Sequence, residues 1–468
     1  MKMTTIARVA RALGAGACLS MASQAQAANW LMLQGTEPAG SSQRVDIWGF
    51  VQAKWEKDYS DPYVNGAGQE LYIPPKLLGP DLDSQEGFQV NRARLGARGT
   101  GFPLDDKVNY FLLAEFGNNG ITYADGGSGR LTDASITLNY IPHARIRVGL
   151  FKYPGAEEGL QAIHVFDYIN FTEVTNQLML ERFPNQHYTA NANPVTLPVD
   201  DSNGGLNQFD DPVGAFRDVG VQVFDAFRTG RWEHSYAAMI GNGNGLNYSN
   251  SDDEYDTYLY WSSELVFGGQ GPRREGLKLF VWNQDGKRLL DQTDDGTWNP
   301  KKYDRERRGL GAKYLRNGLR LAGEYMQGKG MIFVGPDKPT FDQNGYSAAD
   351  PEAANGADGE AYGYYLDAGW RIPSSKWDVD LRYDEYHRLS DDPGPATGAN
   401  AGRSFESVWK TWTLGVQYHF NLKTRATLNY AIRDVRSPDW ESSSLAGNPD
   451  EQMKGIGNRL GVQLTHIF

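Results

Sequence analysis

The stretch VDIWGFVQAKW (45–55) alternates apolar and polar side chains along most of its length. Successive side chains of a β-strand point to opposite faces, so a strand here carries Ile47 and Val51 on one face and Gln52 and Lys54 on the other. A single strand of this kind has little diagnostic value. Its repetition along the chain decides the fold.

Fifteen further segments show the same alternation, which gives sixteen candidate strands. The number is even, as it is in single-chain bacterial barrels. In KVNYFLLAEF (107–116), for example, Tyr110 and Leu112 lie opposite Asn109 and Glu115. The other segments are 91–99, 133–140, 144–151, 218–227, 232–240, 257–267, 275–282, 307–315, 319–326, 361–372, 376–383, 409–420, 424–432 and 459–468.

The connections between these segments alternate in length. Those after the even-numbered strands are short and include Thr229-Gly230 and Asn317-Gly318, and Asn-Gly is a strong hairpin signal. Those after the odd-numbered strands are long and polar. Short periplasmic turns and long external loops are typical of outer-membrane barrels. We therefore predict an all-β fold, a transmembrane antiparallel β-barrel of about 16 strands over residues 45–468.

The first 27 residues have the features of a signal peptide. A basic start with Lys2, Arg8 and Arg11 precedes a short apolar run, and Ala25-Gln26-Ala27 forms a cleavage site. We expect export to the outer membrane of a Gram-negative bacterium, with residues 28–44 as a periplasmic leader or a short segment that enters the pore.

Composition excludes several classes of function. Without the three basic residues of the signal peptide, 43 Lys and Arg face 58 Asp and Glu, a net charge of −15, which argues against nucleic acid. The only cysteine, Cys18, lies in the signal peptide, so the mature chain lacks thiol chemistry, disulfides and haem attachment motifs. The seven histidines are scattered. We expect no enzyme activity, no metal site and no cofactor.

The longest connection, residues 154–216, is the third external loop. A loop of this length is usually functional, and a 16-stranded barrel encloses an aqueous channel, so we expect it to fold inward and narrow the pore. From residue 155 to 212 it holds nine acids and one base. These acids either form a negative constriction, or cap short helices and bind wall arginines. The candidate constriction residues are Glu157, Glu158, Asp167, Glu173, Glu181 and Arg182.

The stretch NRARLGAR (91–98) places three arginines on one face of a strand. An arginine that faces lipid costs about 2–4 kcal/mol at the bilayer midplane, so this face must line the lumen. The same argument applies to two other strands. The basic side chains either form a track for anions or pair with lumenal acids, and both interpretations stay open. The candidates are Arg92, Arg94, Arg98, Arg145, Arg147, Arg305, Arg307 and Lys313.

Several stretches together resemble the phosphate-selective porin O/P family of outer-membrane porins. They are FVQAKWEKD, FQVNRARLGARG, VNYFLLAEFG, VGLFKYP, LMLERF, RDVGVQV and GRWEHSYAAMIGNGNG. The resemblance implies a homotrimer of 16-stranded barrels, a third loop inside each lumen, and an arginine ladder that corresponds best to Arg92, Arg94, Arg98, Arg145 and Arg147. Phosphate-selective members have lysines at the constriction, whereas this third loop has none.

We therefore expect an outer-membrane channel for passive diffusion of small hydrophilic solutes, with a preference for anions such as phosphate or other oxyanions. The expected partners are outer-membrane lipid and lipopolysaccharide around the barrel and small anions within it. The alternative is a barrel that sheathes a periplasmic electron-transfer cytochrome. A third loop inside the pore would argue against this alternative, because it would block a threaded partner.

Overall fold

A computed structural model describes most of the chain from residue 45 to its end, and a short segment before it. The described residues are 30–33, 45–64, 70–72, 86–100, 105–119, 121–122, 129–180, 214–246, 248, 250, 253–269, 271, 273–290, 301–333, 355–356, 358–391, 406–442 and 449–468. Within these ranges, no helix is both long enough and apolar enough to cross a membrane.

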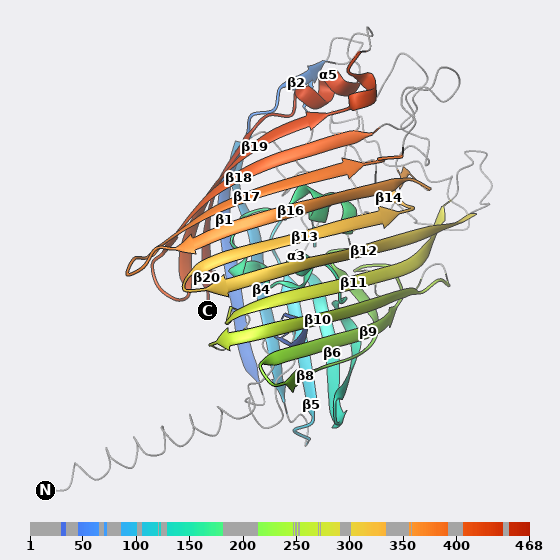
Figure 1. Ribbon diagram of the computed structural model, residues 1–468, viewed down its shortest axis with the longest axis vertical. Helices are drawn as coiled ribbons and strands as arrows, with labels where there is room; N and C mark the ends of the chain where they lie inside the picture. The colour runs from blue at the N-terminus through green and yellow to red at the C-terminus, as the bar shows by residue number, and fades with distance from the viewer. Residues whose placement is uncertain are drawn as a thin grey trace, which may run out of the picture.

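Sixteen of the described strands form one closed antiparallel barrel (Figure 1). Each strand pairs with its neighbours in sequence, and β1 closes the ring by pairing with both β20 and β4. The barrel strands are β1 (Asp46–Asp58), β4 (Glu86–Thr100), β5 (Val108–Glu115), β6 (Arg130–Ile141), β7 (Ala144–Lys152), β8 (Arg217–Thr229), β9 (Trp232–Gly241), β10 (Asp256–Gly268), β11 (Glu275–Leu290), β12 (Lys301–Arg316), β13 (Leu319–Lys329), β16 (Glu360–Arg371), β17 (Trp377–Arg388), β18 (Ser407–His419), β19 (Thr424–Arg436) and β20 (Arg459–Ile467).

The predicted fold is confirmed, and each predicted strand segment corresponds to one barrel strand. We call the end of the barrel with the short connections and the C-terminus the turn end, and the opposite end the loop end. The strands β11 and β12 extend further toward the loop end than the predicted 275–282 and 307–315. Their added outward positions are charged, as in the Lys287–Asp304 pair at 3.5 Å, which hid the continued alternation.

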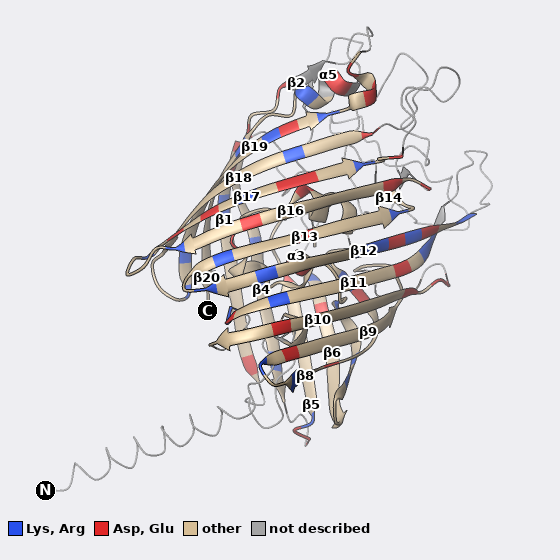
Figure 2. Cartoon of the chain, in the orientation of Figure 1, with Lys and Arg blue, Asp and Glu red and all other residues tan. Residues whose placement is uncertain are grey.

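The two faces of the barrel wall differ in polarity, as the alternation predicts. Outward positions carry exposed apolar side chains such as Ile47, Leu112 and Leu310, whereas most inward polar side chains are buried. Figure 2 shows the charged residues of most strands as isolated bands separated by uncharged residues. This arrangement fits a lipid-facing outer surface and a polar interior.

A bulge at Asn91 changes the parity of β4. Register shifts there, so that Arg92 lies opposite Gln52 whereas Val90 lies opposite Ala53. On the turn-end side of the bulge the even-numbered Arg92 and Arg94 point inward and are buried. On its other side the even-numbered Phe88 is 89% exposed. The argument that the arginines of NRARLGAR share one inward face therefore holds for the residues after Asn91, and the facing is reversed before it.

We predict that Leu310→Arg destabilises the barrel by about 2–4 kcal/mol, because it places a guanidinium group in lipid. Leu310 is 59% exposed on β12. The free energy of unfolding in urea, measured in lipid vesicles, tests this prediction. The control Leu310→Phe should change that free energy little. Equal stability of Leu310→Arg and the wild type would contradict the assigned outer face.

Candidate functional site

The described part of the third loop, residues 154–180, packs against the inner face of the barrel. It contains three short helices, α3 (Glu157–Leu160), the 3₁₀ helix η2 (Ile163–Val165) and the π-helix η3 (Thr175–Met179). All residues of α3 and η3 are buried. No side-chain cap closes the amino end of these helices, so contacts with the wall must hold the loop in place.

Two glycines in the wall make room for the loop. A Cβ atom on Gly363 of β16 would lie 2.8 Å from Cγ2 of Val174, and one on Gly328 of β13 would lie 2.6 Å from Cδ1 of Leu178. Both distances are shorter than real Cβ contacts allow. The side chains of Val174 and Leu178 therefore pack against the sheet where the wall has no side chain.

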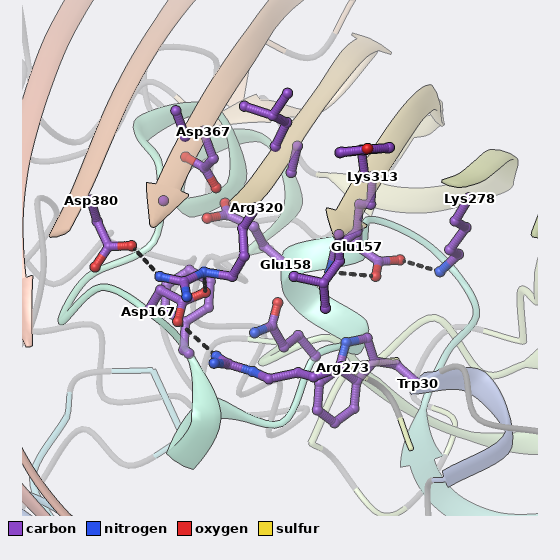
Figure 3. A pocket seen from close by; sticks show the side chains of 18 of the residues that line it. Trp30, Glu157, Glu158, Asp167, Arg273, Lys278, Lys313, Arg320, Asp367 and Asp380 are labelled. Atoms are coloured by element: carbon purple, nitrogen blue, oxygen red, sulfur yellow. Dashed lines mark hydrogen bonds and ion pairs between the residues drawn. The ribbon is translucent and has the colours of Figure 1, made fainter. Parts of the chain in front are cut away.

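Glu157 forms the first ionic anchor of the loop (Figure 3). Its carboxylate lies 2.7 Å from Nζ of Lys278 on β11 and 3.1 Å from Nζ of Lys313 on β12. Its backbone N–H donates to Glu324 at 3.1 Å. Burial alone would raise the pKa of Glu157, but the two ammonium groups outweigh it and lower the pKa to about 2. Glu157 is therefore ionised at neutral pH.

The second anchor is the pair of Glu158 with Arg382 on β17, at 3.4 Å. Glu158 also accepts a hydrogen bond from the hydroxyl of Thr172 at 2.5 Å, which ties α3 to the later part of the loop. The guanidinium group of Arg382 lies over the ring of Tyr168, 4.2 Å from its centre. Ion pair and cation–π contact thus hold two separate parts of the loop at one wall arginine.

Asp167 provides the third anchor, at the turn end. It lies 2.7 Å from Arg273, in the β10–β11 connection, and 3.7 Å from Arg320 on β13. The same Arg320 pairs with Asp380 at 2.5 Å (Figure 3). Further around the wall, Arg425 on β19 donates to the carbonyl of His164 at 3.2 Å. The loop therefore contacts strands from several sides of the barrel.

The loop separates two cavities. The larger has an empty volume of about 980 Å³, its open mouth included, and is lined by the inward side chains Lys278, Lys313 and Arg320 near the turn end. The smaller, about 440 Å³, is lined by Arg382, Asp384, Arg433 and Arg459 among others. Loop residues 166–168 border the larger cavity and residues 169–171 the smaller one, so this segment forms the partition.

The predicted arginines of β4 and β7 lie on the opposite side from the anchors on β11 to β17. Arg94 pairs with Glu115 at 2.6 Å, Arg98 with Asp46 at 3.3 Å and Arg145 with Asp225 at 3.3 Å. Arg92 donates to the neutral amide of Gln52 at 3.1 Å. Arg147 donates to the hydroxyl of Thr137 at 3.3 Å and lies 4.5 Å from the ring centre of Phe224.

Two further cations extend this group. Arg217 on β8 pairs with Asp133 at 3.0 Å, and Lys152 at the end of β7 donates to the carbonyl of Gln161 at 2.8 Å. Lys152 lies within electrostatic range of Arg92, Arg94 and Arg217. We give the name basic cluster to a group of seven residues. It consists of the five cations Arg92, Arg94, Arg147, Lys152 and Arg217, and the two carboxylates Glu115 and Asp133.

The basic residues predicted on β12 include two that bind the third loop, and one of them also binds the chain just after β13. Arg307 donates to the backbone carbonyls of Leu178 at 3.1 Å and Met331 at 3.0 Å, and Lys313 binds Glu157. Arg305 is buried with 1% exposure. Among the predicted loop residues, Glu173 is buried and its backbone N–H donates to Asp384 at 3.0 Å. Glu181 and Arg182 lie outside the described residues.

Sequence reasoning missed the wall residues that bind the loop. Lys278, Arg382 and Arg425 all have inward parity, which the alternation could have revealed, but no sequence pattern states which loop acid each cation meets. Within the part of the chain that the structure describes, no group of three or more His, Cys, Asp or Glu side chains is arranged to hold a metal ion.

We predict that Glu157→Gln destabilises the protein at neutral pH by about 3–5 kcal/mol, because it leaves the buried ammonium group of Lys278 and the half-buried one of Lys313 without their carboxylate. The folded pKa of Glu157, about 2, lies below its ordinary value of 4.5. The stabilisation is therefore complete above pH 4.5 and is lost as the pH falls toward 2.

Unfolding free energies of wild type and Glu157→Gln at pH 7 and pH 2.5 test this prediction. The difference between them should shrink at the lower pH. A conservative control is Glu406→Gln, which removes a carboxylate at the loop end near His387. A difference for Glu157→Gln that is independent of pH would contradict the ionic anchor.

Comparisons with known proteins support the fold. No protein-family model matches the sequence, and no curated protein matches it. An anion-selective porin from Comamonas acidovorans has a similar structure, with a TM-score of 0.51 and 16% identity over 91% of this chain and 100% of that chain. OprB of Pseudomonas putida, in a high-pH structure, has a TM-score of 0.51 and 12% identity over 91% of this chain and 94% of that chain. At these identities the likeness concerns the fold and does not single out a phosphate-selective group. The chain thus has a β-barrel fold similar to that of outer-membrane porins.

Proposed function

We propose that this protein is an outer-membrane channel for the passive diffusion of small hydrophilic solutes, with a preference for anions such as phosphate or other oxyanions. The observation that carries the preference is the basic cluster on β4, β7 and β8. Its five basic side chains outnumber its two carboxylates, Glu115 and Asp133.

The separation of charges inside the barrel supports this proposal. The loop acids Glu157, Glu158 and Asp167 bind cations on or beside β11 to β17, away from the basic cluster. They therefore neutralise one side of the lumen and leave the other positive. Arg92 uses the neutral amide of Gln52 as its hydrogen-bond partner, so no carboxylate at that contact offsets its charge.

The positive charges of the lumen also affect the pKa of the loop residue His164. Its ring lies 5.0 Å from that of Phe50 and 5.7 Å from that of Trp48. Burial, followed by the positive charges of Arg425 and Arg94, lowers its pKa to about 3. The neutral imidazole adds no charge of its own. Because the basic cluster is buried, its cations act on the pore mainly through their electrostatic field. Salt screens the field of buried charges less than that of exposed charges.

The mechanism is diffusion along this field without any chemical step. Conduction requires sites that attract an ion and still release it, and cations already engaged in hydrogen bonds meet that condition. Among the predicted arginines of β4 and β7, solutes can meet Arg98 and Arg145 directly, because these side chains are 36% and 24% exposed. The third loop has no lysine. We therefore propose a general anion preference rather than strict phosphate specificity.

The proposed setting is the outer membrane, with lipid and lipopolysaccharide around the barrel, and a homotrimer as the assembly. The porin-like fold and the apolar outer face support the setting. The alternative of a sheath around a cytochrome requires a wide, open lumen. The contacts of the third loop with β11, β13 and β19 count against it.

We predict that Arg92→Gln lowers the anion-to-cation permeability ratio by about two- to seventeenfold, because one charge about 10 Å away is worth about 0.4–1.7 kcal/mol in media between water and protein surface. The measurement is the reversal potential in planar bilayers under a potassium chloride gradient. The control Arg436→Gln removes an exposed loop-end arginine paired with Asp434 and should leave the ratio unchanged.

A cation-selective reversal potential of the wild type would contradict the anion preference. If the wild type is anion-selective but phosphate fails to block chloride current, only the part of the proposal that concerns phosphate fails. The variant Arg147→Gln should also lower the ratio, because it removes another buried charge from the basic cluster.

A further inference from the structure

A short segment before the barrel lies among the lumenal side chains. The helix α2 (Trp30–Leu33) precedes β1, and its first three side chains are buried, with exposures of 7% for Trp30, 1% for Leu31 and 2% for Met32. These exposures do not fit the expected periplasmic leader over residues 28–44. They fit the other expectation for this segment, a stretch that enters the pore.

The neighbours of this segment place it beneath the third loop. Trp30 lines the larger cavity together with Glu157, Arg273 and Lys313 (Figure 3). Trp30, Leu31 and Met32 belong to the same cluster of buried apolar side chains as Leu160 of α3 and Phe151 of β7. The segment therefore occupies the turn-end part of the lumen, between the loop and the wall.

The attachment of the segment permits it to leave. Twelve residues connect Leu33 to Asp46, where β1 begins at the turn end. At about 3.3–3.6 Å per extended residue, they reach about 40 Å, which is enough to withdraw α2 without breaking a barrel strand.

The contacts of the segment suit reversible binding. Residues 28–33, ANWLML, carry no charged side chain, although the cavity around Trp30 is lined by charged residues of both signs. The indole N–H of Trp30 has no acceptor among the described residues. Apolar burial favours the bound position, while ordering the chain and burying an unpaired N–H oppose it.

We propose that Trp30–Leu33 form a tethered plug, which borders the turn-end cavity and narrows the pore until it is displaced. This inference rests on the channel function proposed above. A short tether gives the segment that it holds an effective concentration in about the millimolar range. A solute that takes the space of the Trp30 side chain therefore competes with the plug at about millimolar concentration, and the channel opens more fully when that solute is abundant.

Single-channel conductance in planar bilayers tests the plug. A variant that lacks residues 28–33 behind an intact signal peptide should conduct about two- to threefold better than the wild type, because an apolar constriction restricts water and ions. Trp30→Ala should give an intermediate increase. The matched control is Trp377→Ala, whose side chain is 46% exposed at the turn end and should leave conductance unchanged.

The position of the plug can be measured without any transport assay. Because the mature chain is expected to have no cysteine, Leu31→Cys provides a unique thiol. It should react with a water-soluble maleimide roughly ten times more slowly than Leu422→Cys, as expected for a site that must open before it reacts. Leu422 is fully exposed in the β18–β19 turn.

The outcomes separate the plug from the channel function. Equal labelling rates for the two thiols, or equal conductance with and without residues 28–33, would overturn the plug. In the second case the channel function would stand, because current would still be measured. Absence of current from every variant, including the wild type, would instead overturn the proposed channel function.

Discussion

A bilayer interior, the setting proposed for this barrel, offers no hydrogen-bond partner to a polypeptide backbone, and the closed sheet of this molecule meets that constraint. A sheet satisfies it only by closing on itself, so the first and last strands must pair, as β1 and β20 do. Closure divides each strand into a lipid face and a lumen face. Because charges are costly toward lipid, nearly all strand charges at membrane depth must be accommodated inside, where they need partners or water.

The third loop is the main partner that the chain supplies. Its acids bind Lys278, Lys313, Arg320 and Arg382, and wall glycines such as Gly363 make room for its apolar side chains. The loop thus acts as an internal counter-ion for one side of the lumen. The opposite side keeps more cations than carboxylates. The proposed anion preference therefore rests on the uneven distribution of partners, since the chain as a whole is acidic.

Strands and loop differ in how far the sequence predicts them. Alternation has a period of two and is visible in any sixteen-strand chain, so the strands, the long third connection and the inward face of Arg94 or Arg147 could be predicted. The partner of each charge could not, because pairing across the lumen joins residues such as Glu158 and Arg382 that are more than 200 positions apart. The buried position of Leu31 was equally hidden, since a four-residue apolar helix has no periodicity to detect.

The bulge at Asn91 affects how this chain should be aligned with other barrels. Asn91 is buried, and its side-chain amide donates to Gln463 on β20 at 3.1 Å, past the intervening strand β1. One extra residue there reverses the facing of everything before it in β4. An alignment that runs through this point without a gap would equate lipid-facing Phe88 and Val90 with pore-lining positions of a relative. A single-residue insertion in a barrel strand thus moves several positions at once between the outer surface and the interior. When β4 is aligned with a strand of another barrel, the hydrophobicity on each side of Asn91 is a better guide to equivalent positions than residue identity.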